Sequence, residues 1–164
     1  MPAILRRERE FTETYYRYVD MVYRVCYSFM KNPADTEDMV QETFLRLMSS
    51  KKAFHNESHQ KAWLIVTASN LCKDALKARW RTEENIEDYN SYAAPEKRTD
   101  SVLEAILALS PDYKTVVYMF YYEGYSTAEI ARFLRCPEAT VRSRLHRARK
   151  QLHSLLGGDQ DDEA

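Results

Sequence analysis

The residues whose types and spacing most clearly indicate a chemistry lie between Ala139 and His153. This segment holds five arginines or lysines and no acidic residue. At helical spacing Val141, Leu145, Ala148, Leu152 and Leu155 share one face, which we expect to be buried. The charged side chains of the opposite face are all basic, whereas a solvated helix face usually mixes both signs of charge. The segment therefore predicts a helix that binds DNA.

The place of each polar residue along this helix predicts what it contacts. Side chains near the start of a recognition helix reach base edges, and those further along reach phosphates. We expect base contacts from the residues of the first turns and phosphate contacts from Arg149 and Lys150. The predicted DNA-binding set is Thr140, Arg142, Ser143, His146, Arg147, Arg149 and Lys150.

A shorter helix must precede this one and help to position it. The sequence Ser126-Thr-Ala-Glu129 is a capping box, in which the two side chains satisfy each other's backbone N–H groups at a helix start. The apolar residues that follow end at Arg135-Cys136-Pro137. A short capped helix, a tight turn and a longer basic helix predict a helix-turn-helix, whose second helix enters the major groove.

Apolar residues recur at helical spacing in the rest of the chain as well. They predict helices over residues 11–31, 33–50, 58–80 and 111–123, with Ser58 as the cap of the third. Glycine is scarce, with three residues in 164, which leaves little room for turn-rich β structure. The expected fold class is all-α. The aromatic cluster Tyr118, Phe120, Tyr121, Tyr122 and Tyr125 is interpreted as helix packing.

Charge divides the chain into four parts, although the net charge is −1. Residues 1–82 carry 14 basic and 10 acidic side chains, residues 83–100 carry 2 and 6, residues 101–158 carry 8 and 5, and residues 159–164 carry four acids. We expect two small helical domains, 1–81 and 100–158, joined by a flexible linker, 82–99, and followed by an acidic tail, 159–164.

Several function classes are disfavoured by the sequence. No apolar run is long enough to cross a bilayer, and the first residues do not form a signal peptide. Three widely separated cysteines, Cys26, Cys72 and Cys136, are expected to be reduced thiols in a cytoplasmic protein. Phosphate-loop and metal-ligand spacings are absent. We therefore expect no enzyme activity, no catalytic residues, no metal, no cofactor and no membrane insertion.

Three motifs, in order, resemble the extracytoplasmic-function (ECF) sigma factors of the sigma-70 family. Region 2.2 of that family resembles NPADTEDMVQETFLRL, which begins at Asn32. Regions 2.3 and 2.4 resemble HQKAWLIVTASNLCKDALKARWR, and region 4 is similar to SPDYKTVVYMFYYEGYSTAEIA with TVRSRLHRAR. The resemblance covers nearly the whole chain and implies region 2 over residues 1–81 and region 4 over residues 100–158.

The resemblance implies partners and further site residues. Region 2.2 of the family binds the β′ coiled coil of core RNA polymerase, which assigns that role to Asp35, Asp38, Gln41, Glu42, Leu45 and Arg46. Regions 2.3 and 2.4 recognise and melt the minus-ten promoter element, which implies DNA contacts from His55, Asn56, Asn70, Lys73, Lys77, Arg79 and Arg81. Region 4 implies binding of the minus-thirty-five element by the basic helix, and binding of the β flap.

Family members are often held inactive by an anti-sigma factor, so such a partner is expected here too. The expected function is promoter-specific transcription initiation with core RNA polymerase, in the bacterial cytoplasm and at the nucleoid when the protein is active. The alternative is a stand-alone helix-turn-helix regulator that binds DNA without polymerase.

Overall fold

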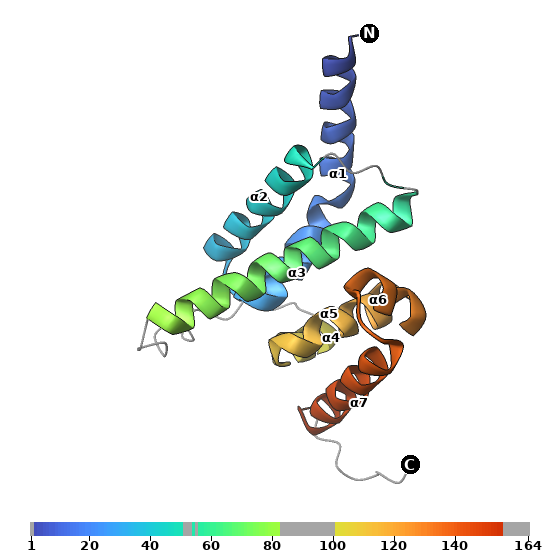
Figure 1. Ribbon diagram of the computed structural model, residues 1–164. Coiled ribbons are helices and arrows are strands. Elements are labelled where there is room, and N and C mark those ends of the chain that lie inside the picture. The colour runs from blue at the N-terminus through green and yellow to red at the C-terminus, as the bar shows by residue number, and fades with distance from the viewer. Residues whose placement is uncertain (1, 51–53, 55, 83–100, 156–164) are drawn as a thin grey trace. The chain divides into compact units, whose positions relative to one another are not determined.

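The computed structural model describes residues 2–50, 54, 56–82 and 101–155, which form helices and no strand (Figure 1). The predicted all-α fold class is therefore confirmed. The chain divides into two compact units, Met1–Leu76 and Lys77–Ala164, and the boundary between them falls within helix α3. The predicted linker, apart from residue 82, and the acidic tail lie outside the described residues.

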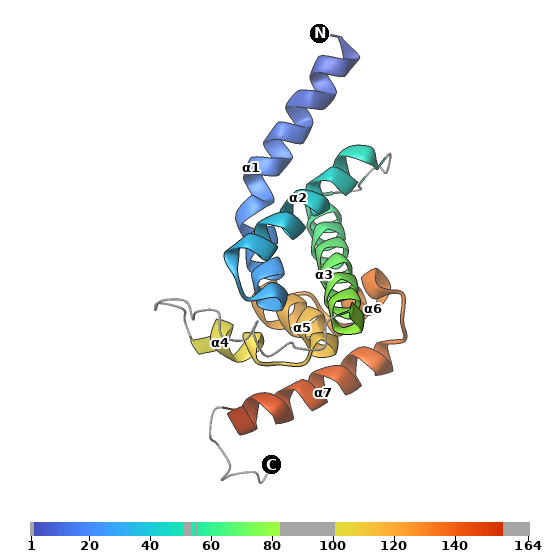
Figure 2. The same ribbon diagram turned by 90° about the vertical axis from the view of Figure 1, so that its left-hand side faces the viewer.

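Helices α1 (Ala3–Met30) and α2 (Pro33–Ser49) form an antiparallel pair in the first unit (Figures 1 and 2). Between them Lys31 adopts the left-handed conformation, with φ of 65°. The side chain of Asn32 then caps α2, because its oxygen accepts a hydrogen bond from the backbone N–H of Asp35 at 2.9 Å. The helix thus begins at residue 33, as predicted from the sequence.

The prediction that the first helix begins near Phe11 was wrong, because α1 begins eight residues earlier, at Ala3. Residues 3–10 are all exposed, so they have no buried face and no apolar period that could reveal a helix. Arginine and glutamate have favourable helix propensities, which supports helix formation without such a face.

Helix α3 (Glu57–Thr82) also begins differently from the prediction. Its capping side chain is Asn56, whose Oδ1 accepts a hydrogen bond from the backbone N–H of His59 at 2.8 Å. The assignment of this cap to Ser58 was therefore wrong. The start of α3 is tied to α1 because the hydroxyl of Tyr18 donates a long hydrogen bond, 3.5 Å, to the carbonyl of Glu57.

Aromatic rings join α1 to α2 in the core of the first unit. Phe44 of α2 makes edge contacts with Phe11 and Tyr15 of α1, at ring-centroid distances of 6.4 and 4.8 Å. Other fully or nearly fully buried side chains of this unit are Val22, Val25, Cys26, Phe29, Val40, Leu64, Ile65 and Ala68.

The second unit contains α4 (Ser101–Leu107) and α5 (Pro111–Val117). The helix predicted to end at residue 123 leaves α-helical geometry earlier, because residues Tyr118–Tyr122 form a π-helical turn. The backbone N–H of Glu123 donates to the carbonyl of Tyr118, five residues back, at 3.1 Å. Gly124 then ends the segment with φ of 79°, as expected for glycine just past a helix.

Helices α6 (Thr127–Leu134) and α7 (Glu138–Leu155) form the predicted helix-turn-helix. Both hydrogen bonds of the capping box of α6 are present. At the end of α6, Arg135 adopts the left-handed conformation with φ of 59°, and the N–H of the next residue donates to the carbonyl of Ala131 at 3.0 Å. The predicted apolar stripe of α7 is buried at Val141, Leu145 and Ala148 and half-buried at Leu152. The side chain of Leu155 lies outside the described residues.

Candidate polymerase and nucleic-acid interfaces

The outer face of α2 holds the residues that the resemblance assigned to polymerase. Val40 and Phe44 are buried on the other side of the helix. Asp38, Gln41 and Arg46 are exposed, and the candidate set also includes Leu45, an apolar side chain that is 54% exposed. An acidic helix face with one exposed leucine suits a basic helical partner.

Two candidate residues of α2 have partners within the helix. The half-buried Asp35 accepts a hydrogen bond at its Oδ2 from the side-chain amide of Asn32, at 2.9 Å, so its carboxylate is engaged at the helix start. Glu42 is half-buried and forms a long ion pair with Arg46, 4.0 Å between Oε2 and Nε. Asp38 and Glu42 lie one turn apart on the same face.

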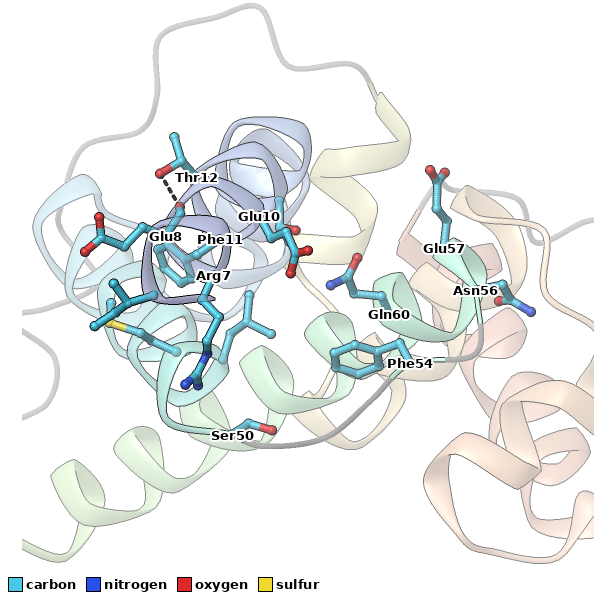
Figure 3. A pocket seen from close by; sticks show the side chains of 14 residues that line it. Arg7, Glu8, Glu10, Phe11, Thr12, Ser50, Phe54, Asn56, Glu57 and Gln60 are labelled. Atoms are coloured by element: carbon cyan, nitrogen blue, oxygen red, sulfur yellow. Dashed lines mark hydrogen bonds between the residues drawn. The ribbon is translucent and has the colours of Figure 1, made fainter. Parts of the chain in front are cut away.

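A groove of about 930 Å³ opens between the first turns of α1, the end of α2 and the start of α3 (Figure 3). Its lining includes the apolar side chains of Ile4, Phe11 and Met48 and the amide of Gln60. The ring of Phe54 and the amide of Gln60 lie on the α3 side of the groove, facing α1 (Figure 3). The volume is of the size that holds small ligands in proteins.

The first turns of α1 contribute to this groove, although no motif in the sequence pointed to them. The other lining residues are Arg7, Glu8, Glu10, Thr12, Thr14, Leu47, Ser50, Asn56 and Glu57. A groove built from three helices that are distant in sequence has no linear signature, because each helix supplies a few ordinary side chains.

The structure places the predicted minus-ten residues in two areas. Asn56 lines the groove, whereas Asn70, Lys77 and Arg81 are exposed further along α3 and Lys73 is half-buried. Their spacing puts these four on one face of the helix. Two others differ. Arg79 is half-buried and lies about half a turn round from that face, and His55 lies outside the described residues.

Helix α7 presents the predicted basic face to solvent. Arg142, His146, Arg147, Arg149 and Lys150 are exposed, and Thr140 and Ser143 are half-buried. The prediction of which face is buried is therefore confirmed, and the DNA contacts of the exposed side chains stay a prediction.

Two arginines of this face already have partners inside the protein. Arg142 Nη1 lies 3.3 Å from Oε2 of Glu138, one turn earlier, and the same Oε2 accepts a hydrogen bond from the hydroxyl of Thr127 at 2.6 Å. Arg149 Nη1 donates to the hydroxyl of Tyr121 at 3.1 Å. Glu138, Thr127 and Tyr121 lie outside the predicted DNA-binding set, although the four-residue spacing of Glu138 and Arg142 is a sign of an ion pair that the sequence shows.

The aromatic cluster divides between packing and surface. Tyr118 and Tyr125 are buried, and Tyr118 stacks on Tyr122 at a centroid distance of 5.0 Å, as the interpretation of helix packing requires. Tyr121 does not fit the interpretation of helix packing, because it is 48% exposed and its hydroxyl accepts a hydrogen bond from Arg149.

Tyr23, a half-buried residue of α1, has a shifted pKa. Burial raises the pKa of Tyr23 above its ordinary value, and the negative charge of Glu37 and the nearby Tyr27 raise it further. The rings of Tyr23 and Tyr27 are stacked, with centroids 6.2 Å apart.

Within the described residues, no group of three histidine, cysteine or carboxylate side chains is arranged to hold a metal ion. No helix there is both long and apolar enough to cross a membrane. Cys26 and Cys72 are buried free thiols, and Cys136 is a half-buried one.

Family models match both halves of the chain. Sigma-70 region 2 matches residues 14–82, and sigma-70 region 4 matches residues 99–152. Among curated relatives, the ECF RNA polymerase sigma factor SigL of Mycobacterium tuberculosis is 30% identical over 154 residues, which cover 87% of this chain and 86% of SigL. The ECF sigma factor SigW of Bacillus subtilis is 28% identical over 158 residues, covering 85% of this chain and 84% of SigW. The ECF sigma factor SigE of Mycolicibacterium smegmatis is 33% identical over 152 residues, covering 85% of this chain and 59% of SigE.

Solved structures support the fold. The sigma factor RpoE of Bartonella quintana, in complex with the anti-sigma factor NepR, matches with a TM-score of 0.69 and 22% identity over 93% of this chain and 99% of RpoE. CnrH, in complex with the cytosolic domain of CnrY, matches with a TM-score of 0.62 and 22% identity over 93% of this chain and 91% of CnrH. With both sigma-70 regions matched in order and SigL aligned over most of its length, the chain belongs to the extracytoplasmic-function family of RNA polymerase sigma factors, the proteins that direct promoter-specific transcription initiation.

Proposed function

We propose that this sigma factor binds core RNA polymerase through the outer face of α2 and the minus-thirty-five promoter element through the exposed face of α7. The observation that carries the proposal is the exposed face of α7, which is basic beyond its first turn while its other face is buried. Since the phosphate backbone attracts such a face regardless of sequence, selection of a promoter has to come from base contacts, and binding to polymerase lets both domains act on one promoter.

The proposed division of labour follows the sequence. Residues 1–81 act as region 2, residues 100–158 as region 4, and residues 82–99 connect them. The partners are the β′ coiled coil and β flap of polymerase, promoter DNA and an anti-sigma factor. Two of the solved relatives are complexes with NepR and with CnrY, which supports a regulator of that kind. We place the protein in the bacterial cytoplasm, at the nucleoid when active, and assign it no catalytic activity.

For the minus-ten element we propose two contact areas on region 2. The groove beside Phe54 and Gln60 accepts an unpaired base, because an aromatic ring offers stacking and side-chain amides offer both donors and acceptors to a base edge. Asn56 also lines the groove, and its Oδ1 is engaged in the cap of α3. The exposed residues Asn70, Lys77 and Arg81 of α3 hold the phosphates of the displaced strand.

Run-off transcription with core polymerase, in the presence and absence of the protein, is the direct test. We expect the protein to stimulate initiation at selected promoters. A stand-alone regulator instead binds an operator tightly and specifically without polymerase, and that outcome together with no stimulation would overturn the proposal.

The polymerase contact has its own test, a double charge reversal of Asp38→Lys and Glu42→Lys. Both side chains lie on the outer face of α2, so we expect weaker binding to core polymerase in a fluorescence titration with unchanged helicity. A matched double reversal of Glu13 and Asp20, which are exposed on α1, changes the net charge equally and should bind core polymerase normally. Unaltered affinity of the α2 variant contradicts the assignment.

A further inference from the structure

The start of the recognition helix carries a small network that lies outside the predicted DNA-binding set. One carboxylate oxygen, Oε2 of Glu138, accepts the hydroxyl proton of Thr127 at 2.6 Å and lies 3.3 Å from Nη1 of Arg142. Thr127 is the first residue of α6 and Glu138 the first residue of α7. The carboxylate therefore joins the starts of both helices of the helix-turn-helix to an arginine in the second turn of α7.

The surroundings of this network show that it does not stabilise the fold strongly. The side chains of Arg142 and Glu138 are 60% and 43% exposed, and exposed ion pairs contribute little to folding free energy. The network lies at the start of α7, and the start of a recognition helix is the part that contacts base edges, so the network is close to where a base pair would bind.

The carboxylate of Glu138 affects both the orientation and the charge of the Arg142 guanidinium. An arginine side chain is long and flexible, and it discriminates a base well when its guanidinium is held in the orientation that makes two parallel hydrogen bonds. The anchored carboxylate of Glu138 restricts Arg142 to directions within reach of Oε2. It also offsets the charge of Arg142, which reduces the attraction of that arginine to phosphates of any sequence.

We propose that Glu138 is a positioning residue that directs Arg142 toward one base pair, and that it thereby sets the base preference at one position of the minus-thirty-five element. The inference rests on the proposed contact of α7 with that element. Thr127 acts indirectly, since its hydroxyl donates a hydrogen bond to the carboxylate of Glu138, which in turn positions Arg142.

The test uses the holoenzyme of full-length protein and core polymerase. Binding is measured by competition between a responsive promoter and versions with each minus-thirty-five base pair replaced. Arg142→Ala should lower the preference at one base pair by about fivefold or more. Glu138→Gln keeps the acceptor for Thr127 and loses the ion pair, so it should lower the preference at the same base pair by about two- to fourfold.

Three further measurements separate positioning from other roles. The double variant of Glu138→Gln and Arg142→Ala should show the preference of Arg142→Ala alone, because Glu138 acts through that arginine. Glu138→Gln should also strengthen binding to non-promoter DNA at low salt, with a steeper salt dependence than the parent. Thr127→Val should reduce the preference at the same base pair by a smaller factor, about twofold, because the ion pair remains.

Asp112→Asn is the control, since it removes one negative charge from the start of α5 in the same unit and should leave every base preference unchanged. Additive effects in the double variant, or an equal loss at all sequences with a lower melting temperature, overturn the proposal. If Arg142→Ala changes no base preference, the proposed role of Arg142 fails and the inference fails with it. If Arg142→Ala acts and Glu138→Gln does not, the inference alone fails.

Discussion

At the scale of single residues, the basic face of α7 consists of side chains in different situations. Arg142 and Arg149 are held by an acceptor within the protein, Glu138 and Tyr121 respectively. Binding of DNA to either arginine therefore exchanges one partner for another, which reduces the net gain in free energy.

Arg147 and Lys150 test the predicted difference between base and phosphate contacts. Arg147→Ala should weaken promoter binding by about 1–3 kcal/mol and relax the preference at one minus-thirty-five base pair. Lys150→Ala should weaken binding to all sequences similarly and flatten the salt dependence of log K by about one unit. Holoenzyme competition over a range of salt concentrations measures both quantities. Equal and sequence-independent losses would show that the assignment along α7 is wrong.

The raised pKa of Tyr23 leads to a pH dependence of stability. Because the pKa is higher in the folded protein, the neutral side chain contributes stability that is complete below the unfolded value of about 10 and is lost as the pH rises toward the folded value. The free energy of unfolding, measured with denaturant between about pH 9 and 11, should thus fall more steeply with pH for the parent than for Tyr23→Phe.

The control for this measurement is Tyr16→Phe, since Tyr16 is 74% exposed on the same helix. The parent and the Tyr16 variant should show the same pH dependence. Parallel curves for the parent and the Tyr23 variant contradict the prediction.

At the scale of helices, the boundaries that could be predicted from the sequence are those set by capping side chains close in sequence to the helix start. Asn32 and the capping box of Ser126 both act within three residues, and both are present. The start of α1 was not predictable, because the exposed segment 3–10 has no apolar period. The π-turn was not predictable either, since it changes a hydrogen-bond register and leaves the residue types of a helix unaltered.

For the candidate sites as well, features formed by residues close in sequence could be predicted, and features formed by residues distant in sequence could not. The basic face of α7 could be predicted because it lies on one helix. The groove could not, because its lining comes from three helices. The hydrogen bond between Arg149 and Tyr121 could not be predicted either, since the two residues are 28 positions apart in the sequence.

Ser126 and Ser110 provide a test of capping in matched positions. Both precede a helix. The side chain of Ser126 accepts a hydrogen bond from the backbone N–H of Glu129, whereas that of Ser110 makes no capping bond and accepts only a long hydrogen bond, 3.4 Å, from the side-chain amide of Gln151. Ser126→Ala should lower the free energy of unfolding by about 1 kcal/mol, and Ser110→Ala by less. Thermal or denaturant unfolding of the full chain measures the two losses, and equal losses would argue against the capping explanation.

At the scale of the whole molecule, the charges of the chain are separated along the sequence. Residues 1–82 and 101–158 are net basic, while residues 83–100 and 159–164 are net acidic. At physiological salt, charges interact over about 8 Å, so an acidic segment competes with DNA when it comes near a basic face. We therefore expect free protein to bind promoter duplex poorly and to require polymerase.

Deletion of residues 159–164 tests this expectation because it removes four acidic residues and no basic one. The shortened protein should bind duplex DNA more tightly than the parent in a gel-shift series, with the largest difference at low salt. A tail of equal length with asparagine and glutamine in place of the acids should behave like the deletion. Tight and specific binding by the full-length protein without polymerase contradicts the expectation and favours a stand-alone regulator.

The π-turn of Tyr118–Tyr122 has a consequence for how the length of this segment can change in evolution. Its hydrogen bond from Glu123 to Tyr118 encloses one residue more than an α-helical bond does. Loss of one residue here would restore α-helical geometry, so a shortened chain still has a continuous helix before Gly124. The side chain presented to Arg149 would then change, because residues before and after the deletion shift relative to each other by one position. Related chains of different length at this point are therefore expected to share the helix-turn-helix and to differ in the partner of that arginine.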